Sequence, residues 1–196
     1  MADSLFDTLQ SQAYKAGITP RSKESMAWFR KKLKSMTDIN RQRLLKDPAV
    51  SKQSTPKPGD MYMFFYDAKH KAKLPYYDQF PLIILADDAK GGFYGLNVHY
   101  LPLTLRAKFF DSLLETVSDK RYNEQTRFRA RYKALKSVQK LKYFKPCFKH
   151  YLSSQVQSGI VKVEPSEWEI AMFMPVQQFK GATDRKVWKD SKDMIG

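Results

Sequence analysis

Three short apolar runs in the middle of the chain, each bounded by turn residues, constrain the fold most strongly. They span residues 61–66, 81–86 and 93–101, and Gly91-Gly92 lies between the second and the third. Runs of this length between Gly, Pro and Asp are typical of strands, and the glycine pair predicts a hairpin. The run 168–174 predicts a later strand, with 160–163 as its partner. Four or five short strands in a chain of 196 residues predict a small SH3-like antiparallel β-barrel.

Helical patterns surround these strands. Thr19-Pro20 predicts a helix start, because a hydroxyl can cap the helix and proline is tolerated at its first position. An apolar stripe at three- and four-residue spacing follows, formed by Met26, Phe29, Leu33 and Met36. Leu5, Phe6 and Leu9 predict a shorter helix before it. Residues 105–117 and 123–141 also have helical patterns, and the latter lacks Gly and Pro.

The sequence therefore predicts an α+β protein with N-terminal helices, a small barrel and a basic helical segment. We expect an N-terminal helical arm at 1–47, a linker rich in Ser, Lys and Pro at 48–59, and a β-barrel domain at 60–196 with inserted helices at about 103–150. An apolar content of 42% is sufficient for a packed core.

Composition excludes several classes of protein. Cys147 is the only cysteine, and the three histidines lie far apart, so no zinc-ligand spacing is present and we expect no metal or cofactor. No run approaches about 18 apolar residues, the minimum for a membrane span. The N-terminus is acidic and amphipathic, unlike a secretory signal peptide. These features indicate an intracellular or virion protein.

Positive charge is concentrated in two stretches. Residues 21–46 hold nine Lys or Arg against two acids, and residues 120–150 hold eleven against Glu124 alone. Their combined excess is larger than the net charge of +15 of the whole chain. Charge gathered in this way produces a face that attracts polyanions, and nucleic acid is the first to consider.

Lys and Arg supply phosphate contacts, and interleaved aromatics can stack on bases at DNA ends. The candidate phosphate-binding residues are Arg30, Lys31, Lys32, Lys34, Arg121, Arg127, Arg129, Arg131, Lys133, Lys136, Lys140, Lys142, Lys145 and Lys149. Tyr143 and Phe144 are the candidate base-stacking residues. The alternative is that the aromatics are buried in an amphipathic helix and that residues 30–34 bind an acidic protein surface.

Three other patterns carry weaker signals. Asp78 with Asp88-Ala89-Lys90 matches the acid spacing of a metal-dependent nuclease superfamily, but 87–90 reads as a turn where that motif needs a strand. Cys147 lies in a basic setting that would lower its thiol pKa, although a packed cysteine is the simpler interpretation. Residues 74–81 place three aromatics between two prolines, which predicts a rigid lid or, alternatively, a docking edge.

Several segments resemble a virion protein family of T-even-type contractile-tailed phages and their cyanophage relatives. These segments are 59–85 (GDMYMFFYDAKHKAKLPYYDQFPLIIL), 92–102 (GFYGLNVHYLP), 142–152 (KYFKPCFKHYL), 165–171 (PSEWEIA) and 186–191 (KVWKDS). The family it resembles is the DNA end protector family, which implies a protein that binds packaged genome termini and blocks a host exonuclease. The resemblance supplies no catalytic residues.

Charge and resemblance together predict a non-enzymatic protein that binds double-stranded DNA ends without sequence specificity. We expect it in the virion, and in the host cytoplasm during assembly and after injection. The alternative is a structural neck, head, tail or baseplate component that docks on acidic phage proteins. A metal-dependent nuclease is a third reading, and no membrane partner is expected.

Overall fold

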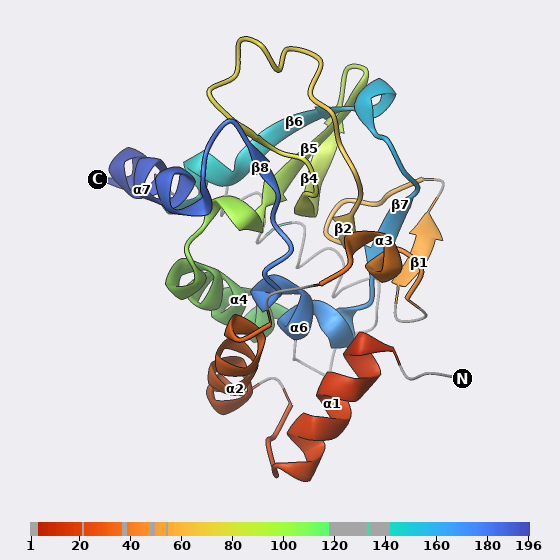
Figure 1. Cartoon of the computed structure of the whole chain (residues 1–196), viewed down its shortest axis with the longest axis vertical. Helices are drawn as coiled ribbons and strands as arrows, with labels where there is room; N and C mark the ends of the chain where they lie inside the picture. The colour runs from red at the N-terminus through yellow and green to blue at the C-terminus, as the bar shows by residue number, and fades with distance from the viewer. Residues whose placement is uncertain are drawn as a thin grey trace.

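One six-stranded antiparallel sheet organises the protein. The computed structural model describes residues 4–20, 22–36, 39–47, 50–53, 55–117, 133 and 142–196. The strand order is β1-β7-β2-β4-β5-β6. These strands are β1 (Val50–Gln53), β7 (Ile160–Val163), β2 (Met61–Met63), β4 (Leu82–Ala89), β5 (Gly92–Asn97) and β6 (Phe148–Leu152). The sheet is flanked by helices, which confirms the α+β class (Figure 1).

The predicted SH3-like barrel is not found. In the described part of the chain β1 and β6 form the two edges of an open sheet and do not pair with each other. The barrel needed a strand at 168–174, but these residues form α6 (Trp168–Phe173). All six residues of α6 are buried. Apart from Glu169 its sequence is apolar, and periodicity alone does not separate a helix that is buried on every side from a buried strand.

The central hairpin forms as predicted. Ala89 pairs with Gly92 across a two-residue turn, in which Gly91 has a φ of 74°. Glycine tolerates this left-handed conformation without the steric cost of a Cβ atom. The following strand is shorter than predicted, because β5 ends at Asn97. The Asn97 side chain accepts a hydrogen bond from the His99 N–H and caps the short helix η1 (Val98–Tyr100).

Helices cover one face of the sheet. α1 (Leu5–Lys15), α2 (Lys23–Lys34) and α4 (Leu103–Val117) gather around α6, on the lower side of the molecule in Figure 1. The predicted stripe on α2 is confirmed, since Met26, Phe29 and Leu33 are buried in the main core. The predicted start of α2 is wrong: Ser22 caps it through a reciprocal capping box with Ser25, and the helix begins at Lys23.

The predicted linker contributes to the sheet. β1 lies within it and pairs with β7 from Val50↔Val163 to Gln53↔Ile160. Before it, α3 (Arg41–Leu44) is fixed by Arg41, whose guanidinium donates to the carbonyls of Val176 and Gln177 at 2.7 and 3.0 Å. Apolar side chains of α1 and α2 belong to the same core cluster as those of β2 and β4. The limits of the expected domains stay a prediction.

The segment 74–81 packs as the predicted lid. Its strand β3 (Tyr77–Asp78) pairs with β8 (Phe179–Lys180) in a second, two-stranded sheet. Phe80 is fully buried, and its ring lies 4.9 Å from that of Phe65. Burial of its aromatic side chains therefore holds this segment on the main sheet.

The C-terminal part completes the fold. The remaining short elements are η2 (Lys142–Cys147), η3 (Ser153–Gln155) and η4 (Pro165–Glu167), and the chain ends in α7 (Asp184–Ile195). Helix α7 packs against η2 and η1. Helix α4 confirms the helix predicted at 105–117. Within the described ranges no helix combines the length and apolarity needed to cross a bilayer.

Candidate nucleic-acid interface

Much of the predicted basic segment lies outside the described residues, including the helix expected at 123–141. The candidates that lie there are Arg121, Arg127, Arg129, Arg131, Lys136 and Lys140. For Lys142, Tyr143 and Phe144 the structure describes the backbone, which belongs to η2. Three candidates of this segment therefore have described side chains: Lys133, Lys145 and Lys149.

These three side chains have different surroundings. Lys133 and Lys145 are exposed. Lys149 is half-buried, and its ammonium lies 4.1 Å from the centroid of the Tyr100 ring. Burial lowers the pKa of Lys149. Lys149 thus has a packing role on β6, whereas Lys145 is available to a ligand in solution.

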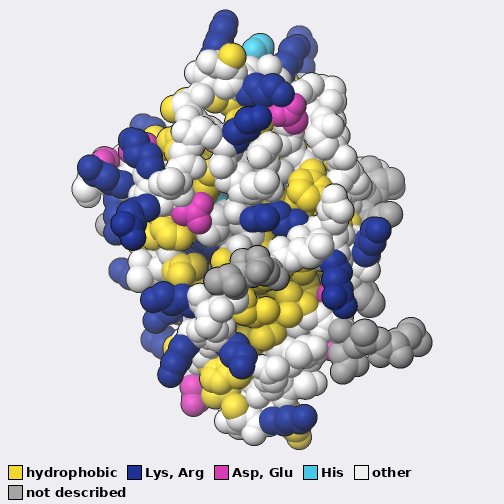
Figure 2. Space-filling model, in the orientation of Figure 1, with side chains coloured by type: hydrophobic (Ala, Val, Ile, Leu, Met, Phe, Trp, Pro, Cys, Tyr) yellow, Lys and Arg dark blue, Asp and Glu magenta, His cyan; other side chains and the backbone are white. Residues whose placement is uncertain are grey.

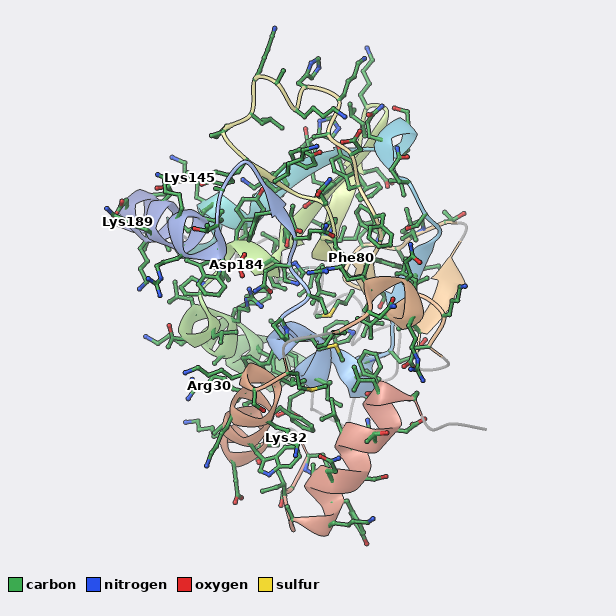
Figure 3. All side chains as sticks on the ribbon, viewed as in Figure 1. Arg30, Lys32, Phe80, Lys145, Asp184 and Lys189 are labelled. Carbon is green, nitrogen blue, oxygen red and sulfur yellow. The ribbon has the colours of Figure 1, made fainter. Side chains whose placement is uncertain are left out.

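Helix α2 presents its four candidate cations in different directions. The helical repeat places Arg30 and Lys34 on one flank, because residues four apart are neighbours on a helix surface. Lys32 is two residues from Arg30 and therefore lies on the other flank. Figure 3 shows Arg30 on the outer side of α2 and Lys32 towards α1. Within the described ranges none of the four has a carboxylate ion-pair partner.

Helix α7 carries a basic stripe that the sequence reading missed. Arg185, Lys189 and Lys192 are exposed and follow at four- and three-residue spacing, so they share one face of the helix. They span roughly 10 Å along the axis at 1.5 Å per residue. Two of the helix's acids are held away from this stripe. Gln177 donates to Asp184 at 2.7 Å, and Asp190 pairs with Lys186 at 2.5 Å.

The opposite face of α7 is fixed to the core. Val187, Ser191 and Ile195 are buried at four-residue spacing. The indole N–H of Trp188 donates to the carbonyl of His99 at 2.8 Å. Since a buried helix face and a directed hydrogen bond set the rotation of α7, they also set the direction in which its basic stripe points.

A buried polar network supports this attachment. Arg106, on α4, is fully buried and donates to the carbonyls of Leu101, Met172 and His99 at 2.8, 3.1 and 3.2 Å. Its guanidinium carbon lies 5.7 Å from the Trp188 ring centroid. Burial lowers the pKa of Arg106 to about 10, so the side chain stays cationic at neutral pH. Arg106 is therefore a structural cation rather than a ligand-binding one.

Asp78 and His99 form the anionic part of this network. His99 Nδ1 lies 2.7 Å from Asp78 Oδ2, and the same carboxylate accepts N–H donors from Phe80, Gln178 and Asn97. Burial lowers the pKa of His99 despite the opposing effect of Asp78. Burial would raise the pKa of Asp78, but His99 and the N–H donors outweigh it, and the pKa is lowered. The pair is thus a neutral imidazole donating to a carboxylate.

Asp78, on which the nuclease interpretation depends, is a member of this network. Asp78 is 2% exposed and its oxygens accept hydrogen bonds from the network. Of the turn expected at 87–90, Lys90 alone lies in a turn, since Asp87, Asp88 and Ala89 belong to β4. In the described part of the chain no group of three or more His, Cys, Asp or Glu could hold a metal ion. The nuclease reading therefore receives no support from these acids.

Cys147 is a packed cysteine. Its side chain is 1% exposed, and burial raises the pKa of its thiol to about 12. The expectation that its basic setting would lower this pKa is wrong, because loss of hydration outweighs the nearby Lys149 and Arg106.

Cations from three elements lie along one side of the molecule, which we call the basic edge. Figure 2 shows Lys and Arg gathered on the left side, over α7, α4 and α2. Figure 3 places Lys189, Lys145 and Arg30 on that side. We define the basic edge by Arg185, Lys189 and Lys192 of α7, Lys145 of η2, and the half-buried Arg30 with the exposed Lys34 of α2.

No curated protein and no solved structure matches the chain. A family model described as phage T4 terminal DNA protecting protein matches residues 1–191. This match spans the helices, the sheet and most of α7, and it agrees with the resemblance carried by the sequence motifs. The chain is therefore a member of the phage T4 terminal DNA protecting protein family.

Proposed function

We propose that this protein binds the ends of double-stranded DNA without sequence specificity and protects them from exonuclease by covering them. The family membership supports DNA termini as the target. The basic edge is the observation that carries the mode of binding, because exposed Lys and Arg contact phosphates, which are the same in every sequence.

Protection by this mechanism needs no catalysis. An exonuclease must load on a free terminus, and a bound protein excludes it. In our proposal the cations between Arg121 and Lys140 also contact phosphates, as their number in the sequence predicts. We place the protein in the virion with the packaged genome, and in the host cytoplasm after injection.

The α7 stripe allows a direct test of this binding mode. Neutralisation of Arg185, Lys189 and Lys192 to Gln should weaken binding to a linear duplex and reduce the salt dependence. Each lost phosphate contact removes about 0.9 from the slope of log K against log salt, so three contacts remove about 2.7. Affinity is measured over a salt series by fluorescence anisotropy, with a closed circle of the same sequence as the second ligand.

A matched control removes the same charge elsewhere. Lys69, Lys73 and Lys90 are exposed in loops at the top of Figure 1, outside the basic edge, and are changed to Gln together. The control should keep the wild-type salt slope and the preference for linear DNA. An equal loss of DNA affinity in both triple variants would mean that net charge alone attracts DNA. Equal affinity of the wild-type protein for the linear duplex and for the closed circle would contradict end binding. The second outcome would favour the structural alternative, docking on acidic phage proteins.

A further inference from the structure

An aromatic ladder crosses β5 and β6 on one face of the sheet. The rings of Phe148 and Tyr94 stack with centroids 5.1 Å apart and an interplanar angle of 17°. The ring of His150 lies 5.1 Å from Tyr94 on the next step, tilted by 42°. The register pairs Tyr94 with His150, and Phe148 shares their face because side chains two apart on a strand point the same way.

The ladder has a partly buried base and an open end. Phe148 and Tyr94 are half-buried, and His150 is exposed. The neighbouring pair Phe93 and Tyr151 stacks on the opposite face and is almost fully buried. Phe93 and Tyr151 thus belong to the core, whereas the exposed His150 leaves part of the ladder in contact with solvent, where it can accept another ring.

The cations suited to phosphate lie at the Phe148 end of the ladder. There η2 carries Lys145 and packs against α7, which bears the basic stripe. Phosphates therefore suit the basic edge, and an uncharged aromatic face suits the ladder.

A DNA end supplies that face. Bases inside a duplex are stacked on both sides, whereas the terminal base pair has one free face. Aromatic side chains stack on bases of any sequence, because every base has a π face. We propose that the ladder of Phe148, Tyr94 and His150 stacks on the terminal base of a DNA end while the basic edge holds the adjacent phosphates. This inference rests on the proposed function and adds the feature that distinguishes an end from an interior site.

The test compares a linear duplex with a dumbbell of the same sequence, whose ends are closed by hairpin loops. A 2-aminopurine at the terminal or at a central position reports stacking by its fluorescence. The full-length protein should quench the terminal probe only. Because His150 is exposed, His150→Ala should fold normally, lose this quenching, and bind the linear duplex roughly 5- to 150-fold more weakly, as expected for one base–aromatic stack.

Two further variants separate stacking from other effects. His150→Phe retains a flat ring and should restore both the quenching and the affinity. His70→Ala removes another exposed histidine, in the loop before β3, and should behave as wild type. Binding of the dumbbell and its salt dependence should be unchanged in all three variants, since the phosphate contacts remain.

The outcomes distinguish the two proposals. If His150→Ala still binds with a steep salt dependence and still prefers linear DNA, the proposal that the ladder stacks on the terminal base is wrong, and the proposed function stands. Loss of affinity in His150→Ala that His150→Phe does not restore would also overturn it, because stacking requires only a ring. Failure of the wild-type protein to bind linear DNA would overturn both.

Discussion

Glu167 provides a quantitative prediction about how the N-terminal helix is held. Its side chain is 6% exposed, and Gln10 of α1 donates to its Oε1 at 2.6 Å. Its other oxygen, Oε2, is buried without a hydrogen-bond partner among the described residues. Burial, followed by repulsion from Asp7 and Asp47, raises the pKa of Glu167 to about 7. The folded protein therefore holds a proton that the unfolded chain releases near its ordinary pKa of 4.5.

The sign of the pH effect follows from this difference. Between the two pKa values the folded state binds more protons, so the free energy of unfolding falls as pH rises from about 4.5 to 7. One pKa unit is worth about 1.4 kcal/mol, which gives about 3 kcal/mol for the full shift. Asp7 is exposed, and solvent screening of its charge reduces this to about 2 kcal/mol.

Glu167→Gln should remove this fall in the free energy of unfolding. The amide keeps an acceptor for Gln10 and carries no charge, so the variant should match wild type near pH 4 and exceed its stability by about 2 kcal/mol at pH 8. Urea unfolding followed by tryptophan fluorescence at several pH values measures the difference. A difference that does not change with pH, or a variant that is less stable at pH 8, would refute the reasoning.

Three further predictions concern the packing that positions the basic edge. Trp188→Phe removes the donor to the His99 carbonyl, which keeps its bond from Arg106, so urea unfolding should show a loss of about 1 kcal/mol. Cys147 should react with a thiol reagent such as DTNB only after urea unfolding, because its thiol is buried and its pKa is raised; rapid reaction of the native protein would contradict this placement. Gly181→Ala should lower the stability by about 1–3 kcal/mol in thermal unfolding, because φ is 90° there and a Cβ would lie 2.7 Å from the Pro75 carbonyl oxygen; a neutral effect would show that the loop between β8 and α7 is free to adjust.

Local patterns predicted some elements well. The stripe of Met26, Phe29 and Leu33 predicts α2, and Gly91 predicts the hairpin turn. Both predictions succeed because each depends on the spacing of a few neighbouring residues. The apolar run at Trp168–Phe173 was misassigned, since burial on all sides hides the helical period. β1 was missed because its short sequence VSKQ is mostly polar and pairs with β7, more than 100 residues away.

The candidate site was less accessible to sequence reasoning. Charge counting found residues 21–46 and 120–150, where cations greatly outnumber acids. It missed Arg185, Lys189 and Lys192 because three aspartates of α7 nearly cancel the charge of that helix. Their four- and three-residue spacing was the available signal. The ladder of Phe148, Tyr94 and His150 depends on the pairing of β5 with β6, which joins residues more than 50 positions apart and cannot be read from spacing.

End protection is tested most directly by exonuclease digestion of linear duplexes of different lengths. Each duplex is labelled internally and digested from its ends with increasing amounts of protein. If the protein covers termini, protection should be complete at about one protein per end and should not depend on duplex length. Neutralisation of Arg185, Lys189 and Lys192 should shift the protection to higher protein concentration. Protection that requires protein in proportion to length would show coating of the duplex instead, and digestion at the unprotected rate would contradict the account.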